Sequence, residues 1–306
     1  MRHLYECPMR WADLDLLGHI NNVVYVDYLQ EARVDMFRVN APDSRADDLA
    51  EGVVVVRHEV TYVSPLTFRF RPVTIECWVT EIRAASFTMA YEIVDGTGED
   101  RVIHLRATTV LTPYVFGTER PRRITPEERE VLERFLTPAP RVRPGRAVAL
   151  DHDGAVHYPV HVRFSDVDVY GHVNNVKYLE FFQESRISLL ASLTADVPDG
   201  RETRIVVAQT DVDYKIPILF RPEPYDCWSR ITRVGTTSMT IESEITDDER
   251  VLSRARVVAV WFDPVTQRPA EPSPALRSVL EKAVLEGAVL EGAVLEGTVL
   301  EPGVAT

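Results

Sequence analysis

The 306-residue sequence has few cysteines and no long apolar run, and both absences narrow the class of protein. Three cysteines are too few, and odd in number, for a disulfide framework, so we expect neither disulfides nor a structural zinc. No stretch approaches the roughly 20 apolar residues of a membrane span. The first residues, MRHLYECPMRWADLD, carry charges and a proline where a signal peptide needs an apolar core. We therefore expect a cytoplasmic protein without a membrane span.

Positive charge is also scarce. The chain has 34 lysines and arginines against 47 aspartates and glutamates, which gives a net charge of −13. This balance argues against nucleic acid or an anionic membrane as the main partner. Only Lys177, Lys215 and Lys282 are lysines, so bidentate phosphate contacts would have to come from arginine. The apolar share of 45% is that of a globular chain, and the length predicts about two domains.

An internal duplication is the most informative feature that the sequence does have. Residues 10–33 read RWADLDLLGHINNVVYVDYLQEAR, and residues 163–186 read RFSDVDVYGHVNNVKYLEFFQESR. Twelve of these 24 positions are identical without a gap, and further matches follow at an offset near 150 residues, including two Phe-Arg-Pro segments. This period is too long for a solenoid repeat, so each copy should be a whole domain.

The duplication predicts where the domains lie. We expect a first domain over residues 1–138 and a second over 157–285. The Pro- and Gly-rich segment 139–156 is typical of a linker, and the VLEGA repeats of 286–306 predict a frayed helix or disorder.

Each copy predicts the same order of elements, a strand, a long helix capped by tandem asparagines, and four strands. The helices are expected near 22–38 and 175–190, and a short helix with a Thr-Pro-x-Glu capping box is expected from residue 125. The strands are expected near 6–12, 53–63, 73–83, 87–94, 102–112, 157–164, 204–216, 225–233, 238–245 and 251–262. A sheet with one long helix lying against it is an α+β layer arrangement.

The segment D-x-D-x-x-G-H-[IV]-N-N-x-x-Y, followed by a helix and four strands, resembles the hotdog-fold thioesterases of the 4-hydroxybenzoyl-CoA thioesterase type. It is also similar to the plant acyl-ACP thioesterases, which carry tandem hotdog domains and a DxDxxxHVNNVKY segment. The resemblance implies two tandem hotdog domains, each an antiparallel sheet wrapped around a long central helix. It also implies that the two halves pair as an internal pseudo-dimer.

The implied reaction is hydrolysis of an acyl thioester, which needs a nucleophile or general base and hydrogen-bond donors for the developing oxyanion. The resemblance places the catalytic carboxylate on the second acid of DxD, Asp15 and Asp168. This carboxylate either attacks the carbonyl carbon or deprotonates a water, and the sequence leaves both routes open. The first acids, Asp13 and Asp166, are expected to accept hydrogen bonds within the loop.

The family's oxyanion donor is a backbone N–H at the N-terminus of the central helix, here placed at Asn22 and Asn175. Free amides and the helix dipole both favour negative charge at this point. Gly18 and Gly171 would let the loop turn tightly beside the substrate. These four positions therefore form the predicted substrate-binding loop.

His19 and His172 match the histidine that is catalytic in the plant enzymes. The asparagine that those enzymes place two residues after the aspartate is replaced here by Leu17 and Tyr170. Two roles stay open for the histidines, orienting the aspartate or the substrate, and shaping the loop. An Asp-x-Asp-x-x-x-His metal site lacks a third and fourth ligand, so no metal and no other cofactor is expected.

Four further duplicated side chains carry weaker expectations. Arg71 and Arg221, in the two Phe-Arg-Pro segments, are candidates for contact with the phosphates of coenzyme A. Glu31 and Glu184, on the central helices, are expected to be buried structural carboxylates that pair with a neighbouring arginine.

The predicted function is that of a cytoplasmic acyl-CoA thioesterase with no cofactor. The alternatives are an acyl-ACP thioesterase and a non-catalytic acyl-CoA-binding module. A hotdog hydratase is disfavoured because neither loop has an Asp-x-Asn-Pro segment before its histidine. A pure binding module is disfavoured because both copies keep the aspartate.

Overall fold

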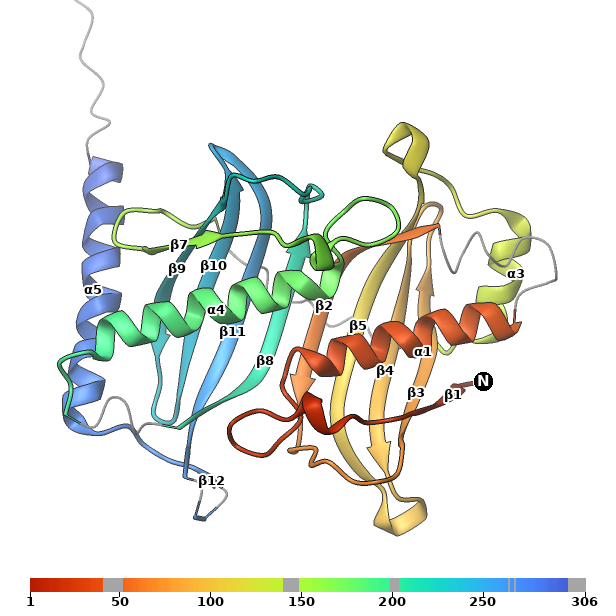
Figure 1. Ribbon diagram of the computed structural model, residues 1–306, viewed down its shortest axis with the longest axis horizontal. Coiled ribbons are helices and arrows are strands. Elements are labelled where there is room, and N and C mark those ends of the chain that lie inside the picture. The colour runs from red at the N-terminus through yellow and green to blue at the C-terminus, as the bar shows by residue number, and fades with distance from the viewer. Residues whose placement is uncertain (41–51, 140–148, 199–203, 264, 267, 297–306) are drawn as a thin grey trace, which may run out of the picture.

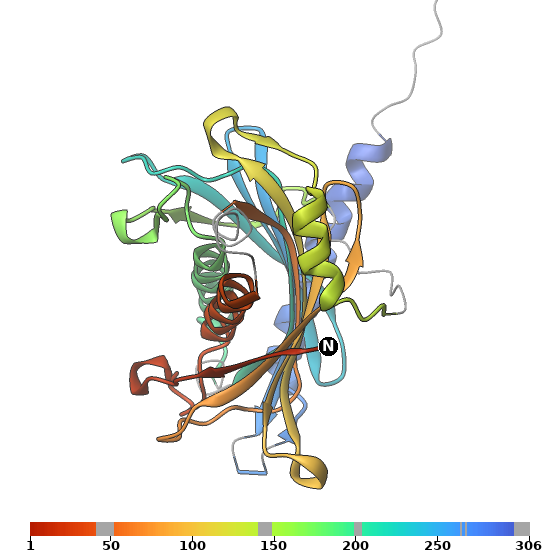
Figure 2. The same cartoon turned by 90° about the vertical axis from the view of Figure 1, so that its right-hand side faces the viewer.

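The computed structural model shows one large antiparallel sheet with two long helices on one of its faces (Figures 1 and 2). It describes residues 1–40, 52–139, 149–198, 204–263, 265–266 and 268–296. Half of the predicted linker, residues 140–148, lies outside these residues, and so does the end of the chain after residue 296. Within the described part, no helix has both the length and the apolar character needed to cross a bilayer.

The first half of the chain follows the predicted order. Its elements are β1 (His3–Cys7), η1 (Trp11–Asp13), α1 (Val24–Asn40), β2 (Val53–Tyr62), β3 (Val73–Ile82), β4 (Phe87–Asp95), η2 (Gly98–Asp100), β5 (Val102–Val115), η3 (Phe116–Thr118), β6 (Arg120–Pro121) and α3 (Pro126–Arg134). The capping box at the start of α3 is confirmed, since Thr125 and Glu128 bond each other's backbone N–H.

The second half repeats the order. Its elements are β7 (Val156–Val160), η4 (Phe164–Asp166), α4 (Asn175–Thr194), β8 (Ile205–Tyr214), β9 (Tyr225–Val234), β10 (Ser238–Asp247), β11 (Arg250–Asp263), β12 (Arg268–Pro269) and α5 (Pro274–Glu296). The strand predicted over 157–164 is wrong at its end, because the chain leaves the sheet at residue 160 and forms a 3-10 turn. The first VLEGA repeats continue α5 as helix to Glu296.

The central helices begin where the tandem asparagines predict. The Asn21 side chain accepts the N–H of Val23 at 2.9 Å, and the Asn174 side chain accepts the N–H of Val176 at 2.9 Å. These bonds satisfy donors that a helix N-terminus would otherwise leave unpaired.

A stripe of apolar side chains on each central helix packs against the sheet. In α1 the fully buried members are Val26, Leu29, Ala32, Met36 and Phe37, at the three- and four-residue spacing of one helix face. The facing strand β3 alternates buried and partly exposed residues, as expected for a strand with one covered face. Burying a side chain such as Leu29 contributes about 1.5–3 kcal/mol, so this layer carries much of the stability.

The two halves join edge to edge in one sheet. The strand order is β1-β3-β4-β5-β2-β8-β11-β10-β9-β7, so each half contributes five strands in the same relative order. At the junction β2 pairs antiparallel with β8, from Arg57 opposite Asp213 to Thr61 opposite Gln209. The arrangement covers two strand edges that a single half would expose.

Candidate active site

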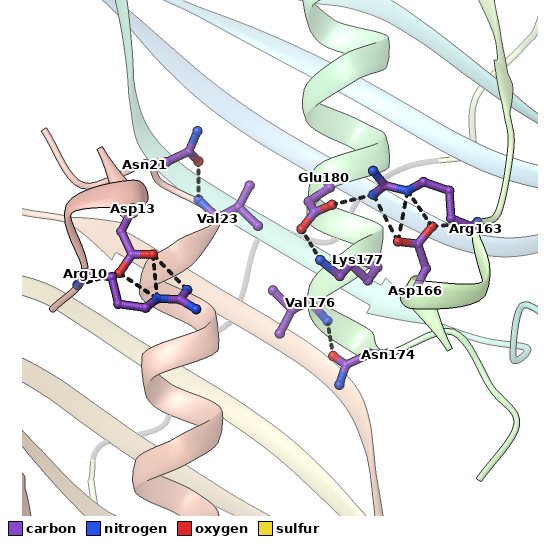
Figure 3. A network of polar contacts seen from close by, with 10 residues as sticks. All are labelled: Arg10, Asp13, Asn21, Val23, Arg163, Asp166, Asn174, Val176, Lys177 and Glu180. Atoms are coloured by element: carbon purple, nitrogen blue, oxygen red, sulfur yellow. Dashed lines mark hydrogen bonds and ion pairs between the residues drawn. The ribbon is translucent and has the colours of Figure 1, made fainter. Parts of the chain in front are cut away.

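Two loops of the same construction connect the sheet edge to the central helices. The first loop (residues 14–23) follows η1 and leads into α1, and the second loop (residues 167–174) follows η4 and leads into α4. A single antiparallel bridge closes each loop, Leu14 with Ile20 and Val167 with Val173. The N-terminal ends of α1 and α4 meet near β2 and β8, so both loops lie where the halves join (Figures 1 and 3).

Asp13 and Asp166 hold the bases of the loops. Both carboxylates are buried. Each accepts hydrogen bonds from the guanidinium and from the backbone N–H of the arginine three residues earlier, Arg10 or Arg163 (Figure 3). Tyr28 also donates its hydroxyl to Asp13 at 2.5 Å. Burial raises the pKa of Asp13, but hydrogen bonds from Arg10 and Tyr28 outweigh burial and hold this pKa below its usual value. Both acids therefore accept hydrogen bonds within the loop, as the sequence predicted.

Asp15 and Asp168 shape the turns at the loop tips. The Asp15 N–H donates to the His19 carbonyl at 2.7 Å, and Oδ1 of Asp15 accepts the backbone N–H of Leu17 at 2.8 Å and that of His19 at 3.1 Å. In the second loop, Oδ1 of Asp168 accepts the N–H of Tyr170 at 2.9 Å. Both aspartates are partly exposed. Their Oδ2 atoms have no hydrogen-bond partner among the described residues, so one carboxylate oxygen of each aspartate holds the turn.

Gly18 and Gly171 occupy the left-handed backbone region, with φ of 75° and 81°. Each donates its N–H to the carbonyl of the aspartate three residues earlier, at 3.1 Å in both loops. Residues with a Cβ rarely adopt this conformation, so glycine is needed for the tight turn itself. The predicted closeness to a substrate stays a prediction.

The backbone N–H groups of Asn22 and Asn175 donate no hydrogen bond to any residue in the described part of the chain. Their carbonyl groups are held, because Tyr62 donates its hydroxyl to Asn22 O at 2.8 Å and Tyr214 to Asn175 O at 2.9 Å. Each free N–H also lies at the positive end of a long helix. The same local arrangement therefore offers a fixed, unpaired donor in both halves, as an oxyanion site requires.

The rings of His19 and His172 contact aromatic side chains from the opposite half. His19 packs edge-on against Phe262 of β11, with ring centroids 6.4 Å apart. His172 lies 5.8 Å from Phe116, which stacks on Tyr170 at 3.8 Å with the rings nearly parallel. In the described residues, neither imidazole forms a hydrogen bond with Asp15 or Asp168. The catalytic role of the histidines therefore stays a prediction.

The Phe-Arg-Pro arginines form ion pairs within their own halves. Arg71 pairs with Asp95 at 2.9 Å, and Arg221 pairs with Asp247 at 2.7 Å. Arg71 is 59% exposed and Arg221 30% exposed. Contact with the phosphates of coenzyme A stays a prediction for both.

The expectation for Glu31 and Glu184 is wrong, because both carboxylates are exposed. The arginines that end the same segments, Arg33 and Arg186, are the buried members instead, at 6% and 8% exposure. Burial lowers the pKa of Arg186 to about 10. The two helices therefore turn a guanidinium, and not a carboxylate, toward the sheet.

A cavity of about 500 Å³ is lined by residues of the first loop and of the second half. Its walls come from the first loop and α1 on one side and from β7, the segment before η4, and α4 on the other. They include Asp13, Asn21, Val24, Arg163, Glu180 and Glu184. Asp15 and Asp168 do not line it. The cavity therefore adjoins the first loop without being built around either aspartate.

Several residues of this region escaped sequence reasoning. Tyr62 and Tyr214 recur at matched positions, so the duplication itself was a usable signal for them. No sequence pattern indicated that Phe116 and Phe262 lie at the loops, because the loop residues that they contact come from the other half of the chain.

A family model described as the thioesterase-like superfamily matches residues 9–135 and 162–280. The chain belongs to this superfamily. The two matched segments coincide with the two structural repeats. A curated relative, the uncharacterized protein YsmA of Bacillus subtilis, is 34% identical over 85 residues, which are 27% of this chain. The chain matches only about half of that relative, 54% of its length.

Solved structures with low sequence identity share the whole fold. A provisionally assigned oleoyl thioesterase from Lactobacillus plantarum superposes with a TM-score of 0.71 at 17% identity, covering 86% of this chain and 97% of that one. The 12:0-ACP thioesterase from Umbellularia californica gives 0.67 at 17% identity, covering 85% and 94%. The α+β class and the two tandem hotdog domains are thereby confirmed.

Proposed function

We propose that this member of the superfamily is an acyl-CoA thioesterase, which hydrolyses the thioester to a free acid and coenzyme A. The observation that carries the proposal is the presence, in both halves, of a partly exposed aspartate in the short loop leading to a helix N-terminal N–H, which donates to none of the described residues. These are the two groups that thioester hydrolysis needs.

In this proposal each group has a role. The thioester carbonyl oxygen accepts a hydrogen bond from the backbone N–H of Asn22 or Asn175. The helix dipole stabilises the negative charge that develops on this oxygen. The free carboxylate oxygen of Asp15 or Asp168 then acts in one of two ways. It attacks the carbonyl carbon, expels the thiolate and forms an anhydride that water hydrolyses, or it takes a proton from the water that attacks.

Coenzyme A is favoured as the carrier by charge. The protein has a net charge of −13, and an acidic carrier protein would meet it more slowly than a small thioester would. The acyl-ACP alternative is supported by the fold shared with the 12:0-ACP thioesterase. We place the reaction in the cytoplasm.

The test is a panel of acyl-CoA and acyl-ACP thioesters with detection of free thiol. Release from acyl-CoA, at a higher kcat/KM than from acyl-ACP with the same acyl group, supports the proposal. Faster release from acyl-ACP selects the alternative. Binding of acyl-CoA without thiol release from any substrate selects a binding module and contradicts both enzyme proposals.

A further inference from the structure

The residue that begins α4, directly after the second loop, forms a side-chain hydrogen bond with the other half of the chain. The side-chain amide of Asn175, the first residue of α4, lies 3.4 Å from Nε2 of His58 in β2. His58 is 1% exposed, and its Nδ1 lies 2.9 Å from the hydroxyl of Thr109 in β5. If Nε2 accepts a hydrogen bond from the Asn175 amide, Nδ1 carries the ring proton and donates a hydrogen bond to the Thr109 hydroxyl.

Asn175 is therefore held from two sides. His58 contacts its side chain, and Tyr214 donates to its carbonyl oxygen at 2.9 Å. The His58 and Tyr214 rings also pack edge to face, with centroids 5.8 Å apart. Both restraints leave the backbone N–H of Asn175 unpaired, so they fix its position without competing for it.

The first loop lacks this cross-half contact. In the antiparallel pairing of β2 with β8, His58 lies opposite Val212 and Val60 lies opposite Thr210, so Thr210 is the counterpart of His58. Asn22 keeps the carbonyl contact from its tyrosine, but its side-chain amide has no hydrogen-bond partner in the part of the chain that the structure describes.

We infer that His58 is a positioning residue for the second active site, supplied by the first half of the chain. The inference rests on the proposed function. His58 fixes the turn that carries the Asn175 N–H, and a donor displaced by a fraction of an ångström stabilises an oxyanion less well. Loss of His58 should therefore lower kcat at the second site and leave KM nearly unchanged.

Burial, with a smaller contribution from the nearby Arg33 charge, lowers the pKa of His58 to about 3. The ring is therefore neutral at any pH at which the enzyme would be assayed. Its positioning effect should not vary between about pH 5 and 9, unlike that of a histidine that exchanges protons with the substrate.

The experiment separates the two sites by inactivating one at a time in the full chain. Asp15→Asn leaves the second site, and Asp168→Asn leaves the first. His58→Thr introduces the residue type of its counterpart, Thr210. This substitution should lower kcat by about tenfold more in the Asp15→Asn chain than in the Asp168→Asn chain, which corresponds to the loss of about one hydrogen bond. His58→Gln, whose amide can still accept from Asn175, should restore most of the difference.

Equal losses in both backgrounds would overturn the inference, because they would mean that His58 only supports the junction. Absence of turnover in the Asp15→Asn chain would overturn it too, since there would be no second site to position. If His58→Thr does not fold, Asn175→Ala removes the same contact from the other side. The α4 cap comes from Asn174 and stays in place. Full thiol release by the double aspartate variant would overturn the separation of the two sites on which the inference is tested. The proposed function itself fails only if the unmodified chain releases no thiol from any acyl thioester.

Discussion

The two loops have the same backbone conformation and differ in the side chains from the opposite half that contact them. Both keep the same aspartate turn, left-handed glycine and unpaired helix N–H. Among the described residues, the second loop and the start of α4 are held by His58 and by a stacked Phe116–Tyr170 pair, whereas the ring contact made with the first loop is an edge contact from Phe262. The two copies thus keep the same aspartate, glycine, histidine and asparagines in the loop and differ in their contacts across the junction.

The helix N-termini show the same divergence. Lys177 of α4 forms a 2.5 Å ion pair with Glu180 (Figure 3). The Lys177 charge also acts on Asp27 of α1. Val24 occupies the position of Lys177 in the first half and lines the cavity beside the first loop. Burial raises the pKa of Asp27, and the Lys177 charge opposes this rise. The two loops thus share their motif residues and differ in their surroundings.

Separating the halves should have the largest effect, because each loop depends on the other half. We propose the boundary after residue 138, and expect the fragment 1–138 to be insoluble or to self-associate through the β2 edge that β8 covers in the full chain. Sedimentation and size-exclusion measurements of the fragment, with the full chain as reference, test this. A stable and active monomeric fragment would show that neither loop needs its partner.

Removing the carboxylates should have the next largest effect. The double variant Asp15→Asn and Asp168→Asn should lose 10²–10⁴-fold or more in turnover with little change in melting temperature. Each single variant should keep a measurable fraction of the activity, and the two fractions should sum approximately to that of the wild type. Near wild-type turnover in the double variant would remove the aspartates from the mechanism. A single variant as inactive as the double would show that the sites act as a unit or that one is only a scaffold.

Local sequence patterns predicted the elements and the loops well, because those depend on neighbouring residues. The asparagine caps and the aspartate turns are formed within about eight residues of chain. The wrong expectation for Glu31 has a simple geometric cause. The buried stripe of α1 runs through Leu29, Ala32 and Met36, and Glu31 lies outside it, whereas Arg33 lies beside it.

Contacts between the halves were beyond local reasoning. His58 meets Asn175 only because β2 pairs with β8 in one register, 117 positions apart in the chain. Comparing the two copies offered no help, since the counterpart of His58 is Thr210. A feature present in one copy only leaves no repeated pattern to find.

The buried acid at the base of the first loop should affect stability more than catalysis. Asp13→Asn loses charged hydrogen bonds and should cost about 1.5–3 kcal/mol at pH 7. The folded-state pKa of Asp13 is lowered, so its contribution is present above the unfolded value of about 4 and is lost as the pH falls through the folded value. Thermal unfolding of wild type and variant should therefore converge at acid pH. Asp15→Asn, with a partly exposed carboxylate, is the matched control, and an equal loss there would contradict the assignment.

The aromatic stack at the second loop should give the smallest effect, and one confined to that loop. Phe116 and Tyr170 lie 3.8 Å apart and nearly parallel, and they come from different halves, so they couple the second loop to the end of β5. Aromatic pairs of this kind contribute about 0.5–1.5 kcal/mol beyond their buried area. Tyr170→Leu, which installs the residue type of Leu17, and Phe116→Leu should each weaken unfolding stability, and the double variant should cost less than their sum by that amount. In the Asp15→Asn chain the same substitutions should change KM for acyl-CoA by a few-fold, and in the Asp168→Asn chain much less. Strictly additive unfolding energies would mean that the stacked rings do not couple the halves, and His58 would then be the contact across the junction that distinguishes the second loop from the first.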